Sequence, residues 1–308
     1  QDHMLANSTV GFDVYLRSNG DAAEALLDSL VNDDVTDTGF LFDDDEDGYF
    51  NFAPDSGDPN QMVVWNWKAN GGTTSSNTDG SITSTVQANT TAGFSIVLYN
   101  GEGDGQATVG HGLGVKPQVI IPKNRGAAGS FHMYHEGIDS SAPEDFGILL
   151  NSTNERADDA GFHNDTAPTS SVFTVGTYNN FDYDYVAYCF AEVEGYSKFG
   201  SYSGNNATDG SFIFTNFTPA LVIIKHITGT AGGTKHWYMW DNKRSPQNVN
   251  DNTLLANSSD GETADSSVKI DILSNGFKLR NAEGAVNNAA KYIYMCWAET
   301  PFKYANAR

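Results

Sequence analysis

"YIYMCWAETPF" at residues 292–302 and "YVAYCFAEVEG" at residues 185–195 are two versions of one apolar strand. "VVWNWKANGG" at residues 63–72 repeats the pattern more loosely. In each stretch large apolar residues alternate and an aromatic residue follows, a pattern with the period of two that is typical of β-strands. The chain therefore contains the same strand three times, which predicts a tandem repeat.

Other landmarks recur in the same order around these strands. In register, the three stretches align Trp67, Phe190 and Trp297, and the last two lie 107 residues apart (190 to 297). The upstream segments that match across all three units are GFLF (39–42), SVFTV (171–175) and NGFKL (275–279); EALLDS (24–29), GILLNS (147–152) and NTLLANS (252–258); and DVYL (13–16), HMYH (132–135) and YMWD (238–241). Units two and three also share KPQVIIPKN (116–124) with TPALVIIKH (218–226), and GFSIVLYNG (93–101) with GYSKFGSYSG (195–204).

Each complete unit reads as roughly seven short strands with turn signals between them. This pattern predicts an all-β protein of tandem antiparallel β-sandwich (jelly-roll-like) domains, with a β-barrel as the alternative. The expected division is an incomplete first sandwich unit at 1–72, a Ser/Thr-rich linker at 73–92, a second unit at 93–194 and a third at 195–308. The first unit is called incomplete because no upstream apolar strand is recognised and the stretch before "DVYL" reads as a loop. The chain is therefore expected to begin inside a domain.

Charge and cysteine content narrow the classes of function. Lys and Arg total 17 against 39 Asp and Glu, a formal net charge of −22. A surface of this sign repels phosphate backbones, so we expect no nucleic-acid partner, and no apolar run is long enough to predict membrane insertion. Cys189 and Cys296 occupy the same position in units two and three, so we expect a buried, reduced thiol in each core rather than a disulfide.

The string "DDDEDG" at residues 43–48 is the strongest metal candidate. Asp43, Asp45 and Asp47, followed by Gly48, fit the beginning of a calcium-binding loop, because hard cations prefer several carboxylate oxygens on a tight turn. The twelfth loop position is Pro54 instead of glutamate, and no helices are predicted on either side. A plain acidic turn and a calcium site of another kind both remain open, and no other cofactor is required.

No motif predicts catalysis. His132 and His135 lie three residues apart on a predicted strand, so alternation places them on opposite faces, where they do not share a metal. The glycine-rich stretch at 101–114 lacks the Lys-Ser/Thr ending of a phosphate loop and reads as a hairpin. No nucleophile elbow occurs, and nothing singles out one carboxylate pair for glycoside cleavage. We therefore expect a protein that is not an enzyme.

Aromatic residues are the remaining candidates for ligand contacts. Those on predicted strands are expected to point mostly inwards, whereas those in the loop "TYNNFDYDY" (177–185), such as Tyr178 and Phe181, are better placed for exposed contacts. The full set of possible stacking platforms for sugars is Trp237, Tyr238, Trp240, Tyr134, Tyr178 and Tyr183. The ligand-binding residues are otherwise not predicted.

Several long strings resemble a repeat found in virion proteins of marine bacteriophages, including phages of cyanobacteria. The segments that carry the resemblance are YVAYCFAEVEGYSKFGSYSG, TPALVIIKH, YIYMCWAETPFKYANAR, SITSTVQANTTAGFSIVLYNG and GHGLGVKPQVIIPKNR. They cover most of residues 5–308. The resemblance implies a structural or adhesive role on the phage particle, and it supplies no catalytic residues.

The resulting expectation is a virion structural protein, the C-terminal part of a tail fibre or adhesin that contacts the host surface. Its expected partners are other virion proteins, a host surface glycan or protein, and further copies of itself, with a trimer favoured. Two alternatives belong to other classes: a capsid decoration or cement protein, and a secreted lectin or carbohydrate-active protein. The expected location is the extracellular virion.

Overall fold

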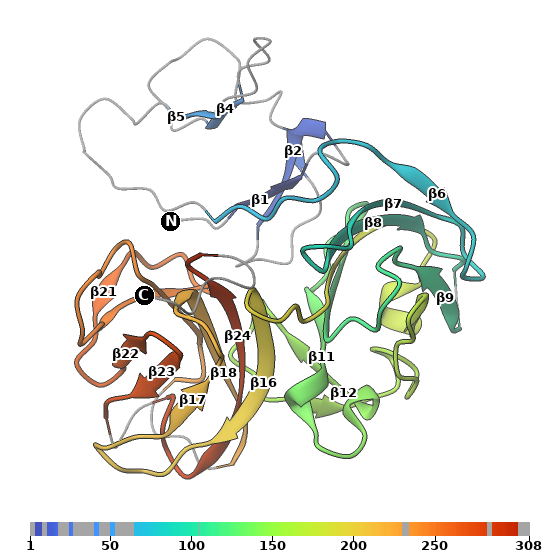
Figure 1. The fold of residues 1–308 in the computed structure, drawn as a ribbon. Coiled ribbons are helices and arrows are strands. Elements are labelled where there is room, and N and C mark those ends of the chain that lie inside the picture. Colours follow the sequence, from blue (N-terminus) through green and yellow to red (C-terminus); the bar gives the residue numbers. More distant parts are fainter. Residues whose placement is uncertain are drawn as a thin grey trace.

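The protein is all-β, with several antiparallel sheets packed as in a sandwich, as predicted (Figure 1). The computed structural model describes residues 65–300 apart from 104, 230–233 and 282–284, together with five short strands nearer the N-terminus. The described helical segments are three short 3-10 helices, η2 (Glu136–Ile138), η3 (Pro143–Asp145) and η4 (Thr177–Asn179). None of the described helices is long and apolar enough to cross a membrane.

The second unit is built on an eight-stranded sheet with the order β13-β12-β11-β10-β15-β8-β7-β6. The two central strands, β10 and β15, are almost entirely buried, because both faces of the sheet are covered. The strands are β6 (Ser75–Asn77), β7 (Ser84–Asn89), β8 (Phe94–Asn100), β10 (Val119–Asn124), β11 (His132–His135), β12 (Phe146–Leu149), β13 (Ala157–Asp158) and β15 (Asp184–Phe190). A two-stranded sheet of β9 (Ala107–Gly110) and β14 (Val172–Val175) forms a core with one of its faces.

The third unit repeats this plan with a six-stranded sheet in the order β16-β24-β18-β19-β20-β21. Strand β18 pairs with β24 and β19 just as β10 pairs with β15 and β11. The strands are β16 (Ser197–Ser203), β18 (Pro219–Gly229), β19 (Trp237–Asp241), β20 (Asn252–Leu255), β21 (Thr263–Ala264) and β24 (Ala290–Ala298). The smaller sheet has the order β17-β23-β22, with β17 (Phe212–Phe214), β22 (Ile270–Leu273) and β23 (Gly276–Leu279).

The two large sheets also pack against each other. Side chains on the faces that point away from the small sheets form one continuous core, which joins Ile121 and Val186 of the second unit to Ile223 and Met295 of the third. The green and the orange-to-red halves of Figure 1 accordingly lie side by side. Units two and three therefore share a hydrophobic core and are not structurally separate domains.

The three repeat-equivalent aromatic residues meet in this shared core. The ring centroids of Trp67 and Phe190 lie 6.0 Å apart, those of Trp67 and Trp297 5.0 Å, and those of Phe190 and Trp297 5.6 Å. All three contacts are edge-to-face, a favourable geometry for aromatic pairs. Phe190 and Trp297 belong to β15 and β24, whereas Trp67 lies in an irregular segment. Equivalent positions of the repeat thus converge on one point.

Two expectations about the N-terminal part need correction. Residues 73–92 are not an extended linker, because Ser75–Asn77 and Ser84–Asn89 are strands of the eight-stranded sheet, and Ile82 and Val86 are buried in the core between this sheet and β9. The stretch before "DVYL" is not a loop, because Met4–Asn7 forms β1.

Strand β1 pairs with β2 (Gly11–Arg17), and β2 pairs with β3 (Ala25–Leu26), in the same order as β10, β11 and β12. The sequence pattern does not reveal β1, because its apolar residues Met4, Leu5 and Ala6 are consecutive instead of alternating with polar residues. The remaining N-terminal strands, β4 (Phe40–Phe42) and β5 (Phe50–Phe52), form an antiparallel pair.

The cysteine prediction is confirmed. Cys189 and Cys296 are free and completely buried, one residue before the equivalent aromatic on β15 and β24. Burial in apolar surroundings raises the pKa of both thiols well above the usual value, so both stay protonated at neutral pH.

Candidate functional site

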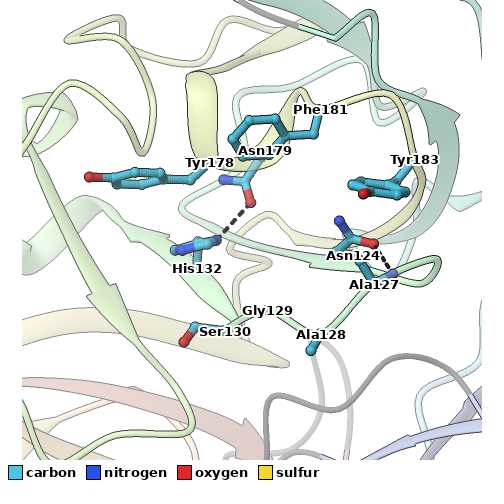
Figure 2. A pocket seen from close by; sticks show the side chains of 10 residues that line it. All are labelled: Asn124, Ala127, Ala128, Gly129, Ser130, His132, Tyr178, Asn179, Phe181 and Tyr183. Carbon is cyan, nitrogen blue, oxygen red and sulfur yellow. Dashed lines mark hydrogen bonds between the residues drawn. The ribbon is translucent and has the colours of Figure 1, made fainter.

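An open cavity of about 490 Å³ lies on the second unit, at the end of β10, β11 and β15 (Figure 2). Its volume is within the range of small-ligand sites. Tyr178, Phe181 and Tyr183 line it and are 40%, 47% and 44% exposed, respectively. These are three of the seven large apolar side chains that are exposed among the described residues. The predicted exposure of Tyr178 and Phe181 is confirmed, whereas ligand contact by the loop aromatics stays a prediction.

The loop that carries these rings is held by one buried amide. Asn180 is completely buried; its side-chain oxygen accepts a hydrogen bond from the backbone N–H of Glu102 (3.1 Å), and its amide nitrogen donates to the carbonyl of Gly105 (3.4 Å). The backbone of Gly101 passes so close that a Cβ there would lie 2.0 Å from the carbonyl oxygen of Phe181. With Asn180 pointing inwards, its neighbours Phe181 and Asn179 face the cavity.

Polar side chains form a second part of the lining. The His132 Nδ1 lies 2.8 Å from the Asn179 Oδ1, and the imidazole stacks on the ring of Tyr178 with centroids 5.4 Å apart. In Figure 2 Tyr178 and Tyr183 stand at either end of the cavity, with Phe181 between them and His132 below Tyr178. Asn124 contributes a second amide, whose oxygen accepts the backbone N–H of Ala127 at 2.8 Å.

The side of the cavity formed by residues 127–130 is positioned by a buried lysine. Lys123 is fully buried, its Nζ donates a hydrogen bond to the carbonyl of Gly129, and it lies 4.9 Å from the ring centroid of Phe131. Lys225 has the equivalent place in the third unit, where its Nζ donates to the carbonyls of Lys235 and Ser152. Both lysines thus fix the connection that follows β10 or β18.

The electrostatics of the site keep its lining neutral. Burial lowers the pKa of His132 to about 4, against a smaller opposing effect of its hydrogen bond to Asn179. The Tyr178 hydroxyl donates to the Asp159 carboxylate at 2.7 Å, and this contact raises the pKa of Tyr178. At neutral pH the cavity therefore offers uncharged rings, amides and one neutral imidazole.

The candidate metal-binding residues do not come together in the described part of the chain. Asp43, Asp45 and Asp47 lie outside the described residues, so the calcium site stays a prediction. Within the part of the chain that the structure describes, no cluster of three His, Cys, Asp or Glu side chains is arranged to hold a metal. His135 contacts the carbonyl of Tyr294 at 3.2 Å, away from His132, so the two histidines do not converge.

The strand aromatics belong to the core, as expected. Trp237, Tyr238, Trp240 and Tyr134 are all buried. Sequence reasoning missed the polar lining of the cavity, namely Asn124, His132, Asn179 and the positioning residue Lys123. One signal was present in the repeat: the positions of Tyr178, Phe181 and Tyr183 correspond to Ala285, Asn288 and Ala290 in the third unit. Aromatics that one repeat has and the other lacks are not needed for the shared fold.

Comparison with known proteins supplies a family but no activity. The family described as domain of unknown function DUF7483 matches residues 1–301. The chain belongs to this family. Its match spans all three repeat units, so the units described above are parts of one DUF7483 domain. No curated protein and no solved structure matches the chain.

Proposed function

We propose that this DUF7483 chain is a structural and adhesive protein of a bacteriophage virion, the C-terminal part of a tail fibre or adhesin, which contacts a host surface glycan through the aromatic cavity of its second unit. The observation that carries the adhesive role is the gathering of Tyr178, Phe181 and Tyr183, all about half exposed, around one cavity with amide groups. The virion assignment is supported by the resemblance of the long repeat strings to phage virion proteins.

The cavity suits a neutral sugar in particular. The apolar face of a pyranose stacks on aromatic rings such as those of Tyr178, Phe181 and Tyr183, which line the cavity and are about half exposed. Asp182, between Phe181 and Tyr183, and Asp184, directly after them, are exposed, and the whole chain carries a formal charge of −22. An anionic glycan is therefore disfavoured by like-charge repulsion.

The lining supports binding rather than cleavage. None of the described residues that line the cavity is an aspartate or glutamate, whereas glycoside cleavage ordinarily requires two facing carboxylates. Weak contacts summed over several copies in a homo-oligomer, for which a trimer is favoured, would provide avidity on a cell surface. Other virion proteins would hold the chain on the particle.

The binding experiment compares the full chain with a variant that carries the third unit's residues: Tyr178→Ala, Phe181→Asn and Tyr183→Ala. We expect an array of neutral bacterial surface oligosaccharides to bind the wild type and the triple variant to bind about 100-fold more weakly, since truncating each buried ring contact costs about 1 kcal/mol or more. Phe214→Ala, which removes an exposed ring far from the cavity, is the matched control. Equal binding by the triple variant would overturn the adhesive role of the cavity.

Antibody labelling of intact particles tests the virion role separately. Label at the tail is the expected result. Label on the shell, at a copy number set by capsid symmetry, would assign the chain to capsid decoration. Absence from particles, combined with sugar binding, would assign it to the secreted lectins.

A further inference from the structure

Two phenylalanines lie exposed on one edge strand of the third unit. Phe212 and Phe214 of β17 are 45% and 56% exposed, while Ile213 between them is buried in the core. Strand β17 is the outermost strand of the sheet β17-β23-β22. Large exposed rings on an unpaired strand edge are a feature that soluble proteins usually avoid, because such an edge recruits other chains.

The second unit shows what covers the equivalent edge. The pairing of Phe173 with Val109 matches that of Phe277 with Ile213, so β9 corresponds to β17, Thr108 to Phe212 and Gly110 to Phe214. In the second unit the segment at 77–84, which bends at residues 79–81, lies along β9. Its Ile82 forms a parallel bridge with Val109 and is 5% exposed.

This segment satisfies the backbone groups at the edge of β9. The backbone N–H of Ile82 donates to the carbonyl of Thr108 (3.0 Å), and the Thr108 N–H donates to the Ser81 Oγ (2.9 Å). The Ser84 Oγ donates to the carbonyl of Gly110 at 2.8 Å. Gly110 itself is required by this arrangement, since a Cβ there would lie 1.7 Å from the Asn77 Oδ1.

Among the residues that the structure describes, no segment covers the equivalent edge of the third unit. Only residues 191–196 connect β15 to β16, and the large sheet ends at β16, where the second unit continues into β7 and β6. The N–H of Leu279 donates to the carbonyl of Ser211, and the N–H of Thr215 donates to that of Asn275, so alternation directs the backbone groups of Phe212 and Phe214 away from β23. No described residue forms a hydrogen bond with these groups on the open side.

We propose that the open edge of β17 accepts an extended strand of a partner protein, with a small polar residue, an aliphatic residue and a second small polar residue in the manner of Ser81, Ile82 and Thr83. The strand would pair with the backbone of Phe212 and Phe214 and pack its side chains against the two rings, the mode of strand addition used in peptide recognition. The charged side chains nearby are already paired, Lys278 with Asp209 (2.5 Å) and Arg280 with Asp271 (3.1 Å), so an uncharged strand fits best. A partner protein fits better than a second copy, because each copy carries a formal charge of −22.

The experiment titrates the full chain with a fluorescent peptide of residues 80–86, GSITSTV, taken from the chain's own covering segment. We expect saturable binding below about 1 mM, the weak end of measurable affinity. The same peptide N-methylated at its isoleucine loses a backbone donor and is expected to bind at least about tenfold more weakly. A lack of binding at that concentration, or equal binding of the methylated peptide, would overturn the proposal.

Substitutions on β17 provide a second test of peptide binding. Phe212→Thr with Phe214→Gly carries the second unit's residues, and Phe214→Thr alone is the milder change should the double variant fail to fold. Either variant is expected to weaken peptide binding at least about tenfold, since the rings supply most of the apolar contact. Sedimentation of the wild type tests the other occupant: a dimer that Phe214→Thr abolishes would give the edge to a second copy of this chain.

Discussion

The loops at 178–183 and 285–290 have the same anchor in the two complete units, and only the first carries exposed aromatic rings. Asn287 accepts the backbone N–H of Asn205 (3.2 Å) and donates to the carbonyl of Ala207 (2.9 Å), just as Asn180 holds Glu102 and Gly105. Outside this anchor the side chains differ completely, with exposed aromatics in the second unit and small or polar residues in the third.

The difference separates what makes the loop from what the loop does. The hydrogen bond from the Gly101 N–H to the carbonyl of Tyr183 and that from Gly204 to Ala290 are both 3.0 Å long. The backbone path is therefore independent of the side chains at the variable positions. A buried asparagine fixes the loop, and the outward positions are free to acquire rings, which is how a structural repeat gains a site without changing its fold.

The largest effect is expected in the shared core, because its contacts determine whether units two and three unfold together or separately. Phe190→Ala and Trp297→Ala each remove a nearly buried ring and are expected to lower the free energy of unfolding by about 3–5 kcal/mol. Trp67→Ala removes a half-buried ring and is expected to have a smaller effect. Denaturant unfolding followed by tryptophan fluorescence and by circular dichroism gives the values.

Fusion through the core also predicts the shape of these transitions. Both probes should report one cooperative transition for units two and three in the wild type and in each variant. Two separate transitions, with only the second unit affected by Phe190→Ala, would show that the units fold independently in spite of their contact.

The two anchoring asparagines provide a matched pair. Asn180→Ala leaves the Glu102 N–H and the Gly105 carbonyl without their partner and is expected to cost about 2–3 kcal/mol of stability. Asn287→Ala should cost a similar amount. Only Asn180→Ala should weaken binding to the oligosaccharide array, by at least about tenfold, because only that loop carries the rings. Equal loss of binding in both variants would mean that the effect is general destabilisation.

The sequence predicted the features that repeat and missed most of those that do not. Alternating apolar residues on β15 and β24 indicate burial. This pattern was sufficient to predict the sandwich, the buried thiols of Cys189 and Cys296 and the inward-pointing aromatic residues. The Ser/Thr-rich segment at 73–92 was misread because polar strands at a sheet edge resemble linkers in composition. The pairing of β7 with β8 and the contact between Ile82 and β9, which together make this segment part of the second unit, are visible only in three dimensions.

Only part of the cavity lining could be predicted from the sequence. Tyr178 and Phe181 stand in a polar loop, where burial is not expected, so their exposure could be predicted. His132, Asn124 and Asn179 come from segments about 8 to 55 positions apart, and only the closure of the sheet brings them together. Lys123 looked like an ordinary strand residue, since nothing local shows that its Nζ ends at the carbonyl of Gly129.

Lys225, the third unit's equivalent of Lys123, allows a test based on the pH dependence of stability. Burial lowers the pKa of Lys225 to about 7, with Lys235 adding to the effect and Glu155 opposing it. The unfolded chain takes up this proton near the usual lysine pKa, so Lys225 costs stability that is fully felt below pH 7 and is relieved as pH rises above it. Between pH 7 and 9.5 the wild type is expected to gain about 3 kcal/mol relative to Lys225→Met. Lys291→Met, which removes an exposed lysine on β24, should show no such trend, and a flat difference for Lys225→Met would contradict the burial of its charge.

The last test concerns His132, which stands where the third unit has Tyr238 and for which we expect almost no change of glycan binding with pH. Because burial lowers the pKa of His132 to about 4, the imidazole is neutral in the folded chain above that pH, whereas the unfolded chain protonates it near pH 6.5. Its contribution to stability is thus present above pH 6.5 and is lost as pH falls towards 4, by at most about 1.4 kcal/mol per pH unit. Array binding should stay within about twofold between pH 8 and 5, since the cavity does not change its charge there. In His132→Asn, urea unfolding should show a shallower loss of stability over the acid range. A binding midpoint near pH 6.5 would mean that His132 titrates as an exposed histidine and that the neutral lining, on which the preference for an uncharged sugar depends, is wrong.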